Sequence, residues 1–201
     1  KKLLNCNSPW LVGRAIWVLP YLGEQGIAEL NKIPSTIGEK DYRYRMAALR
    51  SALRYDRKNL GWSMIEKLRN AKSTHVRRII LTHLRDFPYS KKKSVLLGLV
   101  LSGDMNDRTY LEAVGLAADG DEDSLWAEYC KVRKISDAND WDRQAHLLAW
   151  RLHGDFMIED MVARMLMRDV SPEHRKELVA SLAMNRTQAA FKGMQRVYRK
   201  S

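Results

Sequence analysis

Five histidines are the residues of this chain that could hold a metal ion or carry protons: His75, His83, His146, His153 and His174. Two pairs of them lie eight and seven residues apart, which is two helical turns and exceeds the one-turn spacing of a helical metal-binding pair. No cysteine or carboxylate cluster surrounds them, and the chain has no HExxH motif, Gly-rich phosphate loop or Ser-His-Asp order. We therefore expect no metal site and place the histidines at scattered surface or repeat positions.

The two cysteines, Cys6 and Cys130, form neither a CxxC pair nor the CxxCH motif that attaches haem covalently. We expect no cofactor in this segment, and the oxidation state of the two thiols stays open. No apolar run approaches the length of a membrane span, so no membrane insertion is expected. The chain begins at Lys1 without a methionine or a signal-peptide pattern, and we expect it to be a segment of a longer protein.

One carboxylate–aromatic group, Asp140-Trp141-Asp142, has the residue types of a catalytic site. An Asp just before a helical stretch is also a good N-cap, because its side chain accepts hydrogen bonds from the first turn. We favour the capping role.

Positive charge is concentrated in one part of the chain, whose net charge is +11. Residues 40–93 contain 16 Lys and Arg against 4 Asp and Glu, whereas the remainder contains 19 against 20. The predicted basic patch consists of Arg43, Arg50, Arg54, Arg78, Arg85, Lys91, Lys92 and Lys93. Just beyond it lies an acidic patch made of Asp104, Asp107, Glu112, Asp119, Asp121, Glu122 and Asp123.

Two kinds of partner fit the basic patch. Docking onto a protein or an acidic sister domain requires charge complementarity. Nucleic-acid binding would release counterions at each phosphate contact and would weaken steeply with salt. Four aromatic residues interleave with the charges, as a base-stacking surface would, although tyrosines at helical spacing are also common core residues: Tyr42, Tyr44, Tyr55 and Trp62. We favour a protein partner and keep nucleic acid as the alternative.

A repeat of about 33 residues organises the elements that position these groups. Arg45, Arg77, Arg143 and Arg175 follow one another at steps of 32, 66 and 32 residues, and the skipped slot lies near Tyr110. A fixed period of this length is typical of stacked helix pairs that cover each other's apolar faces. The arginines form a row that either bridges adjacent layers through charge-assisted hydrogen bonds or contacts phosphates, and we favour the structural role.

Caps and prolines divide the chain into six helix pairs, near residues 8–33, 41–70, 74–102, 107–134, 139–168 and 171–200. Helix starts are predicted at Ser8-Pro9, Asp41, Ser90, Asp107, Ser171-Pro172 and Thr187, and helix ends at Pro20 and Pro34. Gly115 lies within a predicted helix and is expected to permit close helix approach. No segment alternates apolar and polar residues with a period of two, so no strand is predicted. We expect one all-α domain spanning residues 1–201.

An N-cap, a small apolar residue before the arginine, and Ala or Leu three and four positions after it together resemble a HEAT repeat. The resemblance covers nearly the whole chain. It implies a right-handed α-solenoid of about six HEAT-like pairs, in which the recurrent arginine ties one repeat to its neighbour through acidic or backbone groups.

The segment from Asp107 to Gly120, with Glu122-Asp123 and Trp150-Arg151, is similar to the helical-repeat region of large bacterial putative membrane-bound dehydrogenases. These exported proteins, of planctomycete and verrucomicrobial type, join a sorbosone-dehydrogenase-like β-propeller, HEAT-like repeats and a c-type haem domain. The resemblance implies a periplasmic or exported location and sister domains as partners. The propeller and the haem-attachment motif lie outside this chain, so no redox role falls on its residues.

We therefore expect a non-catalytic scaffold or docking domain of a larger exported oxidoreductase, which presents the basic patch to partner domains or proteins. The alternative is a nucleic-acid-binding protein. In fold type, basicity and its six tryptophans the chain also resembles the HEAT-like DNA alkylpurine glycosylases. This resemblance implies a carboxylate in an aromatic cleft that stabilises a cationic sugar, and Asp140 or Asp142 would be the candidate. The identity of the partner and the oligomeric state stay open.

Overall fold

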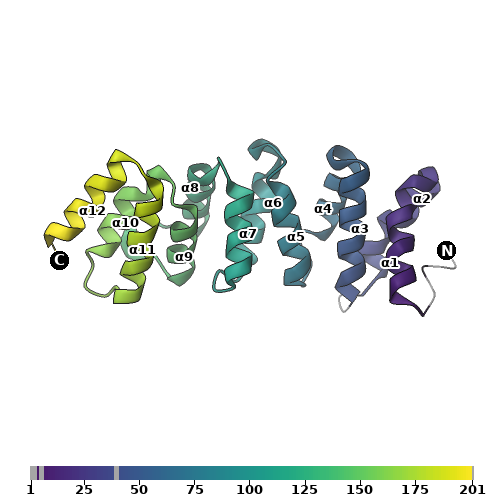
Figure 1. The fold of residues 1–201 in the computed structure, drawn as a ribbon, viewed down its shortest axis with the longest axis horizontal. Helices are drawn as coiled ribbons and strands as arrows, with labels where there is room; N and C mark the ends of the chain where they lie inside the picture. The colour runs from purple at the N-terminus through teal and green to yellow at the C-terminus, as the bar shows by residue number, and fades with distance from the viewer. Residues whose placement is uncertain (1–3, 5–6, 39–40, 201) are drawn as a thin grey trace. The chain divides into compact units, whose positions relative to one another are not determined.

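The structure is a computed structural model that describes residue 4, residues 7–38 and residues 41–200. Every element in these residues is helical and none of them lies in a β-strand, which confirms the all-α prediction (Figure 1). Two compact units make up the chain: unit 1 spans residues 1–83 and unit 2 spans residues 84–201. The boundary falls at the end of α5 (Thr74–Leu84), inside the third predicted helix pair. The single repeat domain over residues 1–201 stays a prediction.

Unit 1 begins with α1 (Pro9–Val18), α2 (Gly23–Thr36), α3 (Tyr42–Tyr55) and α4 (Trp62–Leu68), which are followed by α5. A 3-10 turn, η2 (Leu19–Leu22), joins the first two helices, and a π turn, η4 (Arg57–Gly61), joins α3 to α4. Helix α3 packs against α1, α2 and α4, so it lies at the centre of the unit. Its buried residues include Ala48, Leu49 and Ala52.

The two prolines predicted to end helices in unit 1 behave differently. Pro20 lies in η2, directly after the end of α1, as its missing N–H donor predicts. Pro34 instead lies inside α2, which continues to Thr36, so the prediction that it ends the helix is wrong. A proline in a last turn removes only one intrahelical donor, and the Ile37 N–H still donates to the Ile33 carbonyl at 3.0 Å.

Unit 2 contains α6 (Tyr89–Ser102), α7 (Arg108–Ala118), α8 (Glu122–Arg133), α9 (Arg143–Leu152), α10 (Ile158–Met165), α11 (Pro172–Asn185) and α12 (Gln188–Lys200), with the 3-10 turns η5 (Ala138–Asp140) and η6 (Asp155–Met157). Helices two apart in the sequence pack together: α7 with α9, α9 with α11, α6 with α8, and α10 with α12 (Figure 1). Consecutive helices also touch, for example α11 and α12. The core of the unit therefore lies between two rows of alternating helices.

Side-chain caps begin several helices of unit 2 as predicted. The Asp107 carboxylate accepts hydrogen bonds from the Thr109 and Tyr110 N–H groups at 3.0 and 3.2 Å. The hydroxyls of Ser171 and Thr187 accept from the N–H groups three residues ahead. Ser90 does not begin α6, because Pro88 occupies the N-cap and the helix starts at Tyr89.

Gly115 of α7 permits the close approach predicted for it. A methyl group at this position would lie 2.1 Å from Cζ of Arg151, so the guanidinium of α9 crosses α7 where no side chain stands. From there the Arg151 Nε donates to Glu112 at 2.6 Å. The glycine thus allows an arginine to pass between α7 and α9 and to form an ion pair.

Candidate anion-binding cleft

Two of the four repeat-spaced arginines bind backbone carbonyls of the preceding segment. Arg45, which is buried, donates from Nε and Nη2 to the Ile37 carbonyl at 3.1 and 2.7 Å. Arg175 donates from Nη2 to the Met167 carbonyl at 2.7 Å. Both acceptors lie eight residues upstream, just after α2 and α10, where helical carbonyls have no intrahelical donor. These arginines tie the start of one helix pair to the end of the previous one.

The other two repeat-spaced arginines bind side chains. Arg143 on α9 donates to both oxygens of Glu177 on α11, at 2.7 and 3.1 Å. The same carboxylate lies 2.9 Å from Nε2 of His146, which is buried. Arg77 on α5 donates to the Thr74 hydroxyl at 3.5 Å. The four repeat-spaced arginines thus donate hydrogen bonds to three kinds of acceptor, which are backbone carbonyls, a carboxylate and a hydroxyl.

Three of the four predicted basic-patch residues that lie in unit 2 pair with acidic residues of the same unit. Arg85 pairs with Asp119 at 3.4 Å, and Lys93 pairs with Glu128 at 3.6 Å. The Lys91 ammonium lies 5.4 Å from the centre of the Phe87 ring. Much of the positive charge expected at the surface here is therefore balanced within unit 2.

Lys92 requires a correction. Only 1% of this residue is exposed, and its ammonium lies 2.9 Å from the Asp121 carboxylate. A buried, paired lysine cannot present charge to a partner, so Lys92 does not belong to a docking surface. Its environment also affects Tyr89 on the same helix: burial, together with the Glu128 and Asp121 carboxylates, raises the pKa of Tyr89 to about 12.

In unit 1 the basic patch is open to solvent. Arg43, Arg50 and Arg54 are exposed along α3, and none of the three pairs with a carboxylate within the described part of the chain. Arg78 on α5 is half-buried, with its Nη2 at 3.0 Å from Nδ1 of His75. Unit 1 carries 16 basic against 6 acidic residues, a net charge of +10, whereas unit 2 carries 19 against 18, a net charge of +1. Nearly all of the excess positive charge thus belongs to unit 1.

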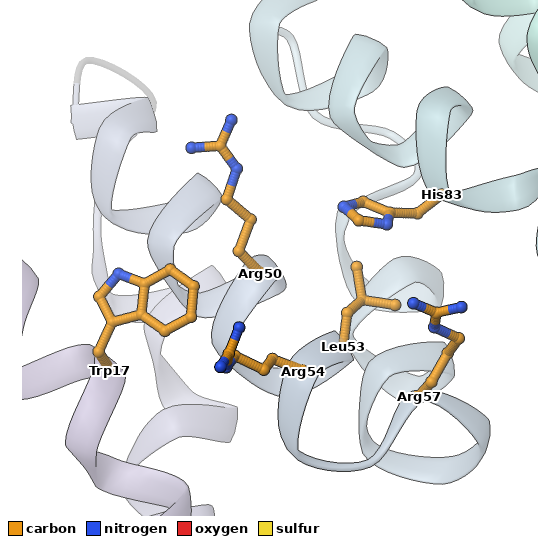
Figure 2. Close-up of a pocket in the computed structure, with 6 residues that line it drawn as sticks. All are labelled: Trp17, Arg50, Leu53, Arg54, Arg57 and His83. Atoms are coloured by element: carbon orange, nitrogen blue, oxygen red, sulfur yellow. The ribbon is translucent and has the colours of Figure 1, made fainter.

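An open cleft of ≈ 550 Å³ lies beside these exposed arginines and is lined by residues of α1, α3, η4 and α5. Figure 2 shows its lining residues: Trp17, Arg50, Leu53, Arg54, Arg57 and His83. The Arg50 and Arg54 side chains lie between the Trp17 indole and Leu53, and His83 lies above Leu53 in this view (Figure 2). No carboxylate is among the described residues that line it, so the cleft is suited to bind an anion.

The sequence identified Arg50 and Arg54 but not the other four residues as members of one site. Trp17 directly follows the buried Ile16 of α1, and 39% of the Trp17 side chain is exposed. The spacing of the buried Val12 and Ile16 defines the inner face of α1 and leaves Trp17 at its edge. His83 lies 33 residues after Arg50, on a different helix, and only the fold of unit 1 brings the two side chains to one cleft.

The two candidate catalytic carboxylates have structural partners. Asp142 accepts from the Ala145 N–H at 2.8 Å, which makes it the N-cap of α9, and it also pairs with Arg133. Asp140 accepts from the Ser136 N–H and hydroxyl at 2.7 and 2.8 Å. These bonds lower the pKa of Asp140. Trp141 between them is buried, with 4% of it exposed, so the three residues do not form an open aromatic cleft.

The described residues include neither a disulfide nor a group of side chains arranged to bind a metal ion. Cys130 is half-buried and forms no disulfide with any of them, and burial raises its pKa to about 11. Cys6 lies outside the described residues. No group of three or more His, Cys, Asp or Glu side chains in the described part is arranged to hold a metal ion. No helix among these residues has the length and apolarity needed to cross a membrane.

The chain matches no family model, no curated protein and no solved structure.

Proposed function

We propose that this chain is a non-catalytic docking domain that binds an acidic protein surface through the cleft of unit 1. The observation that carries the proposal is the contrast between the two units. Arg50 and Arg54 stand at an open cleft with no carboxylate partner among the described residues, whereas Lys92 and Lys93 are paired with carboxylates. A guanidinium stays charged at all physiological pH values and offers a planar fork of donors that matches a carboxylate. The two arginines of this site can therefore bind and orient an anion without themselves acting as an acid or a base.

We further propose that the fold is a right-handed α-solenoid of about six HEAT-like pairs, and that it belongs to a larger exported oxidoreductase whose sister domains are the partners. Support for stacked pairs comes from each unit separately. In unit 2 alternate helices pack in two rows, and in unit 1 α3 packs on α1. Arg45 and Arg175 also make the same bond to a carbonyl eight residues upstream. Support for the exported parent is the resemblance of residues 107–123 and of Trp150-Arg151 alone.

Nucleic-acid binding is the second candidate, and the presence of Trp17 beside two arginines favours it. An exposed indole can stack on a base while neighbouring guanidiniums contact phosphates. The glycosylase version has less support, because Asp140 and Asp142 act as caps and Trp141 is buried.

The experiment compares the wild-type chain with the double variant Arg50→Glu/Arg54→Glu. Both are titrated, by fluorescence anisotropy, into labelled poly-L-glutamate and into a labelled DNA duplex at two salt concentrations. Each exposed ion pair contributes up to about 1 kcal/mol, and reversal adds a like-charge repulsion, so poly-glutamate binding should weaken about tenfold or more. Lys176→Glu/Arg168→Glu, which reverses two exposed charges of unit 2, is the matched control and should bind like wild type.

Far-UV circular dichroism must show the same helix content in all three proteins. Equal poly-glutamate affinity in the cleft variant and in the control would contradict docking through this cleft. Tighter binding to the duplex than to poly-glutamate, with a steep salt dependence, would support the nucleic-acid alternative instead.

A further inference from the structure

We propose that the cleft selects an extended acidic segment that carries an aromatic residue beside its carboxylates. This inference rests on the proposed function and names the chemistry of the partner. It depends on the arrangement of charged and apolar groups in the cleft, in addition to the excess charge of unit 1.

The spacing of the cleft arginines suits two carboxylates of an extended chain. Arg50 and Arg54 lie four residues apart on α3, which is about 6 Å along the helix axis. In an extended segment, side chains on the same face repeat every two residues, or about 6.6 Å. Carboxylates at positions i and i+2 of such a segment can therefore each meet one guanidinium. Neither arginine is occupied by a carboxylate among the described residues.

The same cleft contains apolar surface that carboxylates alone would leave uncovered. Leu53 belongs to its lining but is only 3% exposed, so the Trp17 indole, on the other side of Arg54, supplies the accessible apolar surface (Figure 2). Although α1 buries Val12 and Ile16, 39% of Trp17 stays exposed. Aromatic rings prefer stacked or edge-to-face contact with one another, and a ring on the ligand would cover the indole. An acidic segment with one aromatic side chain would thus match both the charge and the apolar surface.

The extent of the positive charge favours a short peptide over a nucleic acid. A protein that binds duplex DNA tightly contacts roughly six to ten phosphates. Of the six residues that line the cleft, three are arginines, and they lie within eight residues of one another. The cleft volume of ≈ 550 Å³ is in the range that accommodates a compact ligand.

The test uses the whole chain and two labelled peptides that differ at one residue. The first contains Glu-Ser-Glu-Ser-Phe within a Gly-Ser context, and in the second the Phe is replaced by Ala. Dissociation constants are measured by anisotropy for wild type, Arg54→Glu, Trp17→Ala and the unit 2 control Lys176→Glu. An oligo-dT of ten nucleotides serves as the nucleic-acid probe.

We expect wild type to bind the Phe peptide at least fivefold more tightly than the Ala peptide. Trp17→Ala should reduce this ratio below twofold while leaving affinity for the Ala peptide unchanged. Arg54→Glu should weaken both peptides by a similar factor, and Lys176→Glu should change neither affinity. This pattern separates the aromatic contact from the charge contact within one set of proteins.

Three results would overturn the inference. If both peptides bind equally and Arg54→Glu weakens both, the docking proposal survives and the aromatic selection is wrong. If neither the peptides nor poly-glutamate bind, both proposals fail. If oligo-dT binds more tightly than the Phe peptide and Trp17→Ala weakens it most, the cleft is a nucleic-acid site.

Discussion

The buried ion pair between Lys92 and Asp121 allows a sharp test of how unit 2 is held together. Only 2% of the Lys92 side chain is exposed, whereas 28% of the Asp121 side chain is exposed. The Lys92 ammonium and the Asp121 carboxylate are 2.9 Å apart. The two partners should therefore respond unequally to removal. Asp121→Ala leaves a charge inside the protein without a counter-ion, whereas Lys92→Met leaves a carboxylate that water can still reach.

The asymmetry sets the expected magnitudes. Breaking a buried pair costs about 3–5 kcal/mol when one charge is left uncompensated. Because Asp121 is partly exposed, water can enter after its truncation, and we expect Asp121→Ala to lower the free energy of unfolding by about 2–3 kcal/mol. Methionine matches the length of lysine and buries well among Val95, Leu96 and Leu99, so Lys92→Met should cost about 1 kcal/mol or less.

The assay is urea denaturation followed by far-UV circular dichroism and by fluorescence, since Trp126 and Trp141 are buried in unit 2. The double variant Lys92→Met/Asp121→Ala should be about as stable as Lys92→Met alone, because neither charge of the pair is then left without its partner. If Asp121→Ala is as stable as Lys92→Met, the burial argument is refuted. The same result would restore Lys92 to the surface patch.

The sequence predicted those parts of the fold that depend on local chemistry. Asp107 and Ser171 begin their helices because a short polar side chain can bond the first turn in any tertiary context. The end of α2 was not predictable in this way, since Pro34 in the last turn removes only one donor and does not prevent Ile37 from bonding back. The recurrent arginines marked the repeat, but their acceptors follow from where the previous helix ends.

The site was predictable to a smaller extent, and the lysine run shows why. Lys91, Lys92 and Lys93 look equivalent as a charge run, yet Lys92 precedes Val95, Leu96 and Leu99 by three, four and seven residues. That helical spacing places Lys92 on the buried face of α6. The apolar periodicity of the sequence would therefore have distinguished Lys92 from the exposed Lys91 and Lys93. No local signal joins Trp17, Arg54 and His83, because three different helical segments bring them to the cleft.

Two further predictions concern contacts that join consecutive helix pairs. Arg175→Met removes a charged donor from the half-buried Met167 carbonyl and should lower the free energy of unfolding by about 1.5–3 kcal/mol. Lys176→Met, at the exposed neighbouring residue, should change the free energy of unfolding little, and chemical denaturation of both variants would decide this. The second prediction concerns His146, whose pKa burial lowers to about 4, although its hydrogen bond to Glu177 acts in the opposite direction. The unfolded chain, with an ordinary histidine pKa near 6.5, therefore binds more protons than the native state between these values, so stability is full above about pH 6.5 and falls as the pH drops toward 4. The difference corresponds to a loss of about 3 kcal/mol, which denaturation at a series of pH values should show for wild type and not for His146→Gln. An equal pH dependence in both proteins would mean that other groups cause it and that His146 is solvated in the native state.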